Sequence, residues 1–232
     1  EAEGGYAGNL NKKCATIAEV LKENGYITAI TGKWHLTNSP NKPNGAWPTE
    51  RGFDSFFGTL DGCATYFRPG TLTRGLENVE HEAEKNPDFF YTDAIAEEAV
   101  KFIAEKPSDK PYFLYVPFTA PHWPLHAREE TIKSYAGTFD EGWDVIRTKR
   151  LARQKALGII SQETELSPRD ARVLAWEDET EKEWQARRME VYAAMITEMD
   201  TAIGTILDQV EKSGEWDNTI IIFLSDNGAC SE

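Results

Sequence analysis

The sequence has no apolar run of membrane-spanning length, no surplus of positive charge and no regular cysteine spacing. A transmembrane helix needs roughly 20 consecutive apolar residues, so no span is expected, and residues 1–20 lack the charged start and apolar middle of a signal peptide. With 25 basic against 39 acidic residues, the formal net charge is −14. This balance argues against nucleic acid or an anionic membrane surface as the main partner, and an anionic ligand would need local cations.

The three cysteines are odd in number and far apart along the chain. Cys14, Cys63 and Cys230 form no CxxC pair or similar spacing, so neither a disulfide scaffold nor a zinc knuckle is indicated, and the cellular compartment stays open. A P-loop is absent too, because Gly32-Lys33 lacks the earlier glycine and the following Ser or Thr. What is present is a chain of 232 residues with 40% hydrophobic content, which is typical of one globular domain.

Helices and strands are predicted to alternate along the chain. Thr16 with Glu19 three residues later is a capping box that starts a short helix, and Gly25 ends it. Three apolar runs favour buried strands, and two longer patterns favour helices. The predicted strands are residues 26–30, 112–116 and 219–224, and the predicted helices are residues 92–106 and about 183–212. This order predicts an α/β fold with a mostly parallel central sheet flanked by helices.

Two other stretches have a different character. Residues 51–58 are aromatic and are expected to pack, whereas residues 59–91 are expected to be irregular. Residues 127–188 are charged, have no strand-like alternation and are predicted to form a mainly helical insertion. The chain is thus expected to be a single domain, residues 1–232, that carries this insertion.

Polar side chains follow each of the three predicted strands. The carboxyl ends of parallel strands meet at one edge of a sheet, where ligands bind in open α/β folds. We therefore expect these side chains to lie near one another on one active face. They are Lys33 and His35 after the first strand, His122 after the second with His126 as an edge residue, and Asp226 with Asn227 after the third.

These residue types suit the chemistry of an anionic ester. A lysine can neutralise a transferring group, a histidine can exchange a proton near neutral pH, and the oxygens of Asp226 and Asn227 suit calcium or magnesium. Each motif alone also has a structural interpretation: Asp226-Asn227-Gly228 is a common turn, Lys33 can be solvated, and His122 can be a structural histidine in a proline turn.

Taken together, five motifs resemble a type I sulfatase of the arylsulfatase kind. They are Gly32-Lys33-Trp34-His35, Arg51-Gly52-Phe53-Asp54, Ala120-Pro121-His122-Trp123-Pro124, Tyr192-Ala193-Ala194-Met195-Ile196 and Ser225-Asp226-Asn227-Gly228. Their order and gaps match that family over nearly the whole chain. Thr31 and Thr37 depart from the family pattern beside the first motif without removing a functional group.

The resemblance implies an alkaline-phosphatase-like α/β sandwich and a role for each candidate. Lys33 and His35 would contact the nucleophile and the sulfate, and His122 would act on the leaving-group oxygen or bind the sulfate. Asp226 and Asn227 would bind calcium. The substrate would be a sulfate ester of an aryl or carbohydrate alcohol, and the family weakly favours a periplasmic or secreted location.

The family nucleophile is a formylglycine made within a Cys/Ser-x-Pro-x-Arg motif, and no such motif occurs here. The resemblance therefore implies a central fragment, incomplete at both ends: the first strand with its paired aspartates lies upstream of Glu1, and a C-terminal subdomain follows Glu232. This chain alone is expected to be inactive, to bind calcium weakly or not at all, and to self-associate through exposed sheet edges.

Two other functions stay open at this point. A phosphonate or phosphate ester hydrolase of the same superfamily would use the same residues, because sulfate and phosphate esters differ mainly in charge. A non-catalytic relative that binds sulfated glycans would keep the scaffold without the nucleophile. A Cys/Ser-x-Pro-x-Arg motif upstream of Glu1 would favour an enzyme over a binding protein.

Overall fold

The computed structural model describes residues 8–107, 109–225 and 228. The chain folds into two compact units. The first, here called the sheet unit, runs up to His126 and resumes at Glu198; the second, the helical unit, is Ala127–Thr197. In the described residues, no helix is both long and apolar enough to cross a membrane.

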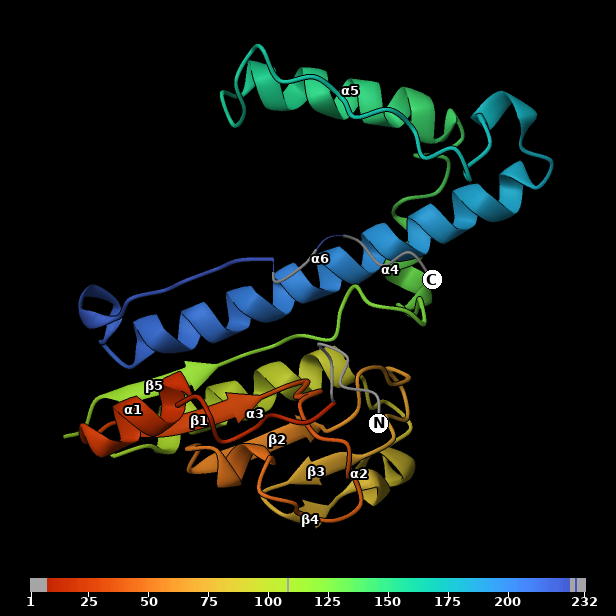
Figure 1. The fold of residues 1–232 in the computed structure, drawn as a ribbon. Helices are drawn as coiled ribbons and strands as arrows, with labels where there is room; N and C mark the ends of the chain where they lie inside the picture. The colour runs from red at the N-terminus through yellow and green to blue at the C-terminus, as the bar shows by residue number, and fades with distance from the viewer. Residues whose placement is uncertain (1–7, 108, 226–227, 229–232) are drawn as a thin grey trace. The chain divides into compact units, whose positions relative to one another are not determined.

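The sheet unit is built on a five-stranded sheet with the order β4-β3-β2-β1-β5. Its strands are β1 (Ile27–Thr31), β2 (Ser55–Thr59), β3 (Leu72–Arg74), β4 (Glu77–Asn78) and β5 (Tyr112–Tyr115). Strand β1 is parallel to both neighbours, with Ile30 opposite Phe56 on β2 and Tyr115 on β5. Strands β3 and β4 continue the sheet in antiparallel pairing, as Figure 1 shows.

The capping box predicted at the first helix is present. Helix α1 spans Ile17–Glu23, the Thr16 hydroxyl accepts from the Glu19 N–H at 3.0 Å, and the Glu19 carboxylate accepts from the Thr16 N–H at 2.7 Å. Two donors at the helix start are thereby satisfied. The predicted strands at 26–30 and 112–116 and the helix at 92–106 are also confirmed within one residue at each end, as β1, β5 and α3 (Tyr91–Glu105).

Helices cover both faces of the sheet because strand side chains alternate between them. Phe56 packs in the cluster that contains Ala18 of α1, and Phe57 packs in the cluster that contains Ile95 of α3. The C-terminal part of helix α6 (Lys182–Lys212) then packs Ile206 against α3. The sheet unit is therefore a three-layer α/β/α arrangement, and the predicted α/β class is confirmed.

The stretch predicted to be irregular contains regular structure. Residues 59–91 hold β3, β4 and helix α2 (Glu80–Lys85). The aromatic stretch before them, residues 51–58, follows the 3-10 helix η1 (Pro48–Glu50) and contains most of β2. The short strands β3 (Leu-Thr-Arg) and β4 (Glu-Asn) show no alternation of apolar and polar residues that would predict a strand. Pairing to β2, rather than hydrophobic pattern, defines them.

The prediction of a final buried strand at 219–224 is wrong for this structure. After the 3-10 helix η3 (Trp216–Asn218), the run forms no strand, and Ile220, Ile222 and Phe223 are 89%, 77% and 76% exposed. A strand requires a neighbour that accepts its ladder hydrogen bonds. In the described part of the chain, this run has no such neighbour, and β5 pairs only with β1.

The helical unit contains α4 (Glu129–Lys133), α5 (Gly142–Ala156), the 3-10 helix η2 (Trp176–Asp178) and the first half of α6. No strand occurs among its residues, all of which the structure describes. Trp143 and Trp176 pack edge to face with ring centroids 4.8 Å apart, and the Asp144 carboxylate accepts from the Trp176 N–H at 2.9 Å. These contacts tie the irregular return segment to α5.

Candidate active site

The ends of β1, β2 and β5 approach one another closely where glycine replaces a side chain. The Gly32 N–H donates to the Phe57 carbonyl at 2.8 Å. A Cβ at Gly32 would lie 2.2 Å from the Pro117 carbonyl oxygen, and a Cβ at Gly58 would lie 1.7 Å from the Gly32 carbonyl oxygen. No larger residue fits either position without moving backbone, so the two glycines let the strand ends converge.

Backbone hydrogen bonds then hold the segment that follows β1. The Lys33 N–H donates to the Pro117 carbonyl at 2.9 Å, and the His35 N–H donates to the Leu60 carbonyl at 3.1 Å. Lys33 is thus attached to the chain that leaves β5, and His35 to the chain that leaves β2. The two predicted residues are presented together at the carboxyl edge of the sheet.

Trp34 anchors this segment from within. Its backbone N–H donates to the Thr59 carbonyl at 2.9 Å, its indole N–H donates to the Ala46 carbonyl at 2.8 Å, and its side chain is buried. With Trp34 packed in the core, Lys33 is half-buried and His35 is exposed. The sequence motif therefore combines one structural residue, Trp34, with two polar residues at the sheet edge.

His35 lies within electrostatic reach of three other titratable groups. Partial desolvation of the imidazole is the largest cause that lowers its pKa, and the Lys33 ammonium lowers that pKa further. The Asp61 carboxylate acts in the opposite direction, and His122 adds to the lowering. The structure thus brings Lys33, His35 and His122 together, as the sequence predicts.

Asp61 is a member of this group that the sequence analysis missed. It follows β2 in the same way that Lys33 follows β1. The rule that polar residues after strand ends form sites would have found it, but β2 was not predicted as a strand because its aromatic run Phe56-Phe57-Gly58 shows no alternation.

His122 is held in a defined orientation. Its N–H donates to the Thr119 carbonyl at 2.8 Å, and its ring Nδ1 lies 2.7 Å from the Trp123 carbonyl oxygen. Because a carbonyl oxygen only accepts, Nδ1 carries the proton in this contact. The second ring nitrogen, Nε2, is then the one that can accept or deliver a proton to a ligand.

Tyr66 connects this histidine to the core. Its hydroxyl donates to the His122 carbonyl at 2.9 Å, and its ring stacks on Phe90 with centroids 6.0 Å apart. The tyrosine is 1% exposed, and burial raises the pKa of its hydroxyl, which therefore stays neutral and acts as a donor. Tyr66 positions the backbone of the loop that carries His122.

His126 belongs to the packing rather than to the group of charges. Its Nδ1 accepts from the Tyr66 N–H at 3.4 Å, and its ring contacts the rings of Tyr66 and Phe67. Burial lowers its pKa. The neutral ring is thus favoured at this position, which matches a structural histidine at the edge of the site.

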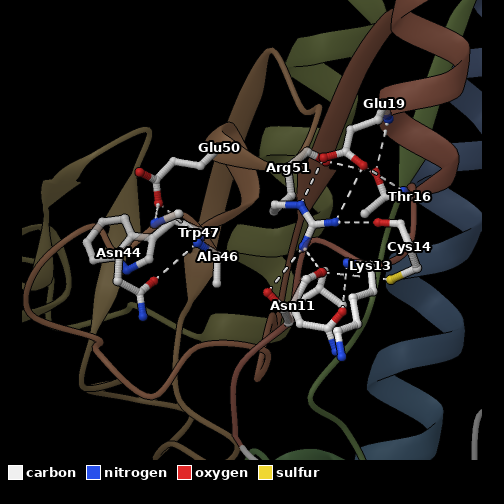
Figure 2. Close-up of polar contacts among 12 residues, drawn as sticks. Asn11, Lys13, Cys14, Thr16, Glu19, Asn44, Ala46, Trp47, Glu50 and Arg51 are labelled. Carbon is white, nitrogen blue, oxygen red and sulfur yellow. Dashed lines mark hydrogen bonds and ion pairs between the residues drawn. The ribbon is translucent and has the colours of Figure 1, made fainter.

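Arg51, from the second family-like motif, holds the chain that precedes α1. Its side chain is 2% exposed and donates to the carbonyls of Leu10, Asn11 and Cys14 and to the Glu19 carboxylate, at 2.9 to 3.2 Å. The hydrogen bond from Arg51 is the largest cause that lowers the pKa of Glu19. Figure 2 shows this buried guanidinium at the centre of its ring of acceptors.

Asp226 and Asn227, the predicted metal ligands, lie outside the described residues. Within residues 8–107, 109–225 and 228, no three or more His, Cys, Asp or Glu side chains gather in a way that could hold a metal ion. The geometry of the site is therefore that of a lysine, two histidines and one carboxylate on a sheet edge.

Comparison with known proteins identifies the family to which this arrangement belongs. The family described as Sulfatase matches residues 2–232. An uncharacterized sulfatase of Schizosaccharomyces pombe is 40% identical over 97% of this chain and 43% of its own length. An arylsulfatase of Klebsiella aerogenes is 37% identical over 97% of this chain and 49% of its own length.

A solved structure shares the fold. The crystal structure of a protein of Bacteroides fragilis that is described as a putative sulfatase matches with a TM-score of 0.59 and 20% identity, covering 92% of this chain and 43% of that one. The chain thus spans less than half the length of these proteins. Since the family matches almost every residue, this chain belongs to the sulfatase family.

Proposed function

We propose that the protein of which this chain forms part hydrolyses sulfate monoesters. The observation that carries the proposal is the convergence of Lys33, His35 and His122 at one sheet edge, with His35 within the electrostatic reach of the other two. Family membership and the similarity to an arylsulfatase support it. The substrate class is a sulfate ester of an aryl or carbohydrate alcohol.

Each residue has a role that its chemistry supports. The Lys33 ammonium neutralises charge that develops on the sulfate oxygens, which is worth most in a partly desolvated site. His122 keeps its Nδ1–H on the Trp123 carbonyl, and in the imidazolium form it carries a second proton on Nε2, which it donates to the leaving oxygen or to a sulfate oxygen. His35, which follows the end of β1, contacts the sulfate or the nucleophile.

Calcium is the proposed cofactor, and Asp226 with Asn227 are its proposed ligands in this chain. A carboxylate and an amide coordinate a metal through oxygen, which favours a hard cation such as calcium. When bound, such a cation supplies positive charge that polarises the sulfate ester. Two ligands are few for calcium, which takes about 6 to 8 oxygens, so the remaining ligands are proposed to come from outside these 232 residues.

The nucleophile is also proposed to lie outside this chain, because no Cys/Ser-x-Pro-x-Arg motif occurs in it. The test is turnover of nitrophenyl sulfate by the full-length protein and by this chain alone. We expect turnover only by the former. Activity of the isolated chain would contradict the proposal of an external nucleophile.

The roles of the residues are tested by substitution in the full-length protein. Lys33→Ala should lower kcat/KM by about 10²- to 10³-fold, which is the loss typical of removing one electrostatic contact to the transition state. His122→Gln should also lower it. His81→Gln is the matched control, because His81 is an exposed histidine on α2; an equal loss in all three variants would contradict the site.

We also propose that the helical unit is an insertion within one catalytic domain, because the sheet unit precedes it and resumes after it.

We further propose that the isolated chain self-associates with a second copy. The support for self-association is the exposed apolar run at 220–224 and the outer edge of β5, which pairs with no strand in the described residues. Sedimentation of the isolated chain should show concentration-dependent association. A monomer at all concentrations would contradict this proposal.

A further inference from the structure

The His35 ring lies directly against the backbone of Gly62. A Cβ at Gly62 would be 2.3 Å from both Cε1 and Nε2 of the imidazole and 2.7 Å from its Cδ2. Real Cβ atoms do not approach other heavy atoms below about 3.0 Å. Any residue other than glycine at this position therefore displaces the ring.

Glycine is required at position 62 because the His35 ring leaves no room for a Cβ, and not because of the backbone conformation. Gly62 does not have a positive φ that would make a side chain costly, unlike Gly58, four residues earlier, which has a φ of +156°. Gly70, in the same connection between β2 and β3, has open space around the position of a Cβ and an ordinary φ. At the position of a Cβ, the two glycines of this connection differ in the imidazole that lies on Gly62.

The backbone segment Leu60–Asp61–Gly62, which the His35 ring contacts and which we call the platform, is held by hydrogen bonds to Thr71. The N–H groups of Leu60 and Asp61 both donate to the Thr71 hydroxyl at 3.2 Å. The Thr71 N–H in turn donates to the Glu80 carboxylate at 2.6 Å. Because the His35 N–H donates to the Leu60 carbonyl, the backbone and the ring of His35 both rest on the same short segment.

The backbone of His35 shows the same constraint. Its φ is +56°, a left-handed conformation that a non-glycine residue adopts only when its surroundings impose it. In this conformation, His35 makes its backbone hydrogen bond to Leu60 and its ring contact with Gly62. The ring is presented toward the Lys33, Asp61 and His122 charges as a result.

We infer that Gly62 is a positioning residue that fixes the His35 imidazole at the active face, and that the segment Leu60–Asp61–Gly62 is its platform. The catalytic consequence rests on the proposed function, while the positioning itself does not. A methyl group at residue 62 should move the ring away from the sheet edge and into solvent, and it should leave the fold intact because the ring is the movable partner.

The positioning is tested in this chain by NMR of the histidine side chains. In Gly62→Ala, the ring signals of His35 should shift and its titration midpoint should rise, because the displaced ring is better solvated. The signals of His126, which packs on Tyr66 and Phe67 and does not contact the Cβ position of Gly62, should stay in place and report an intact fold. Gly70→Ala should change neither; unchanged His35 signals in Gly62→Ala, or equal shifts in Gly70→Ala, would overturn the inference.

A double variant keeps the test decisive if Gly62→Ala fails to fold. Removing the ring removes the clash, so His35→Ala/Gly62→Ala should unfold at the same urea concentration as His35→Ala alone. A double variant as unstable as Gly62→Ala would show that Gly62 serves the backbone, which would overturn the inference.

Kinetics of the full-length protein separate this inference from the proposed function. Gly62→Ala should lower kcat/KM for an aryl sulfate by about 10²-fold, the loss that a misplaced catalytic group produces, and should add no loss in a His35→Ala background. Gly70→Ala should be unaffected. A displaced ring with undiminished turnover would uphold the positioning of His35 by Gly62 and refute the role of His35 in catalysis.

Discussion

Strand β1 and the run at 219–224 have similar β-forming sequences and opposite outcomes. Strand β1, with the sequence Ile-Thr-Ala-Ile-Thr, is buried and paired on both sides, to β2 and to β5. The run Thr-Ile-Ile-Ile-Phe-Leu is more apolar, yet Ile220 is 89% exposed while the polar Thr28 in β1 is fully buried. Hydrophobicity alone does not separate the two segments.

Pairing partners make the difference. In β1, the Thr28 hydroxyl donates to the Gly52 carbonyl at 2.7 Å and accepts from the Asp54 N–H at 3.0 Å. Even a polar side chain can be buried when its hydrogen bonds are satisfied. A strand is therefore a property of a sheet, and an apolar run becomes one only when a neighbouring backbone is available.

The same substitution in both segments tests this contrast most strongly. Ile30→Lys in β1 places a charge at a position with 0% exposure. It should lower the free energy of unfolding by more than about 4 kcal/mol, so that the chain does not fold. Ile222→Lys changes a 77% exposed residue and should stay within about 0.5 kcal/mol.

Urea unfolding followed by circular dichroism measures both free energies. Ile222→Lys should also weaken association of the isolated chain in sedimentation, because it places charge in the exposed run. A large loss of stability in Ile222→Lys would mean that the run is packed in solution and that the contrast with β1 is false.

A single added methyl group at Gly58 should disrupt the close approach of the ends of β1 and β2. Gly58→Ala places a methyl group 1.7 Å from the Gly32 carbonyl oxygen, and backbone cannot yield as a side chain does, so we expect a loss of about 3 kcal/mol or more. Gly70→Ala, in open space, should stay within about 0.5 kcal/mol. Equal unfolding midpoints for the two variants would show that the strand ends are not in contact.

Loss of the Arg51 hydrogen bonds that hold the chain before α1 should have the next largest effect on the free energy of unfolding. Arg51→Ala removes the hydrogen bonds that the guanidinium donates to the carbonyls of Leu10, Asn11 and Cys14 and to the Glu19 carboxylate. Breaking a fully buried ion pair costs about 3–5 kcal/mol, but the Glu19 side chain is 31% exposed and partly solvated, so we expect about 2–3 kcal/mol.

The control for this prediction is an arginine whose ion pair lies on the surface. Arg172 is paired with Asp170, and its side chain is 86% exposed, so Arg172→Ala should cost less than about 0.5 kcal/mol. Thermal or urea unfolding that ranked Arg172→Ala above Arg51→Ala would refute the supporting role of Arg51.

The smallest effect concerns pH. The pKa values of His35 and His126 are lowered in the folded chain, chiefly by desolvation, so the unfolded chain binds protons more readily near its ordinary pKa of about 6.5. The free energy of unfolding should therefore fall as the pH drops below about 6.5, by roughly 1 kcal/mol or less. His126→Gln should reduce this dependence, measured by urea unfolding at pH 7.5 and 5.5, and His81→Gln should not; stability that rose on acidification over this interval would contradict it.

Much of the sheet unit follows from local sequence rules. The capping box at Thr16, the buried runs of β1 and β5 and the apolar face of α3 all predict their elements, because each pattern reports burial of one face or satisfaction of local hydrogen bonds. Lys33, His35 and His122 were found for the same reason: they stand where predicted strands end.

Other features depend on contacts that no local pattern contains. Strands β3 and β4 form because β2 offers them a backbone edge, and Asp61 joins the site only because β2 ends beside β1. No local sequence pattern indicates the role of Gly62, because the imidazole that contacts it belongs to His35, which is distant in the sequence.

The sequence by itself determined the family, the α/β class and the group of charged side chains at the strand ends, because motif order and apolar periodicity are carried by neighbouring residues. Only the tertiary structure decided which apolar runs become strands and how the His35 ring is held. The physical reason is that ladder hydrogen bonds and close approaches at Gly32, Gly58 and Gly62 join residues distant in sequence, so their energy is not encoded in any single segment.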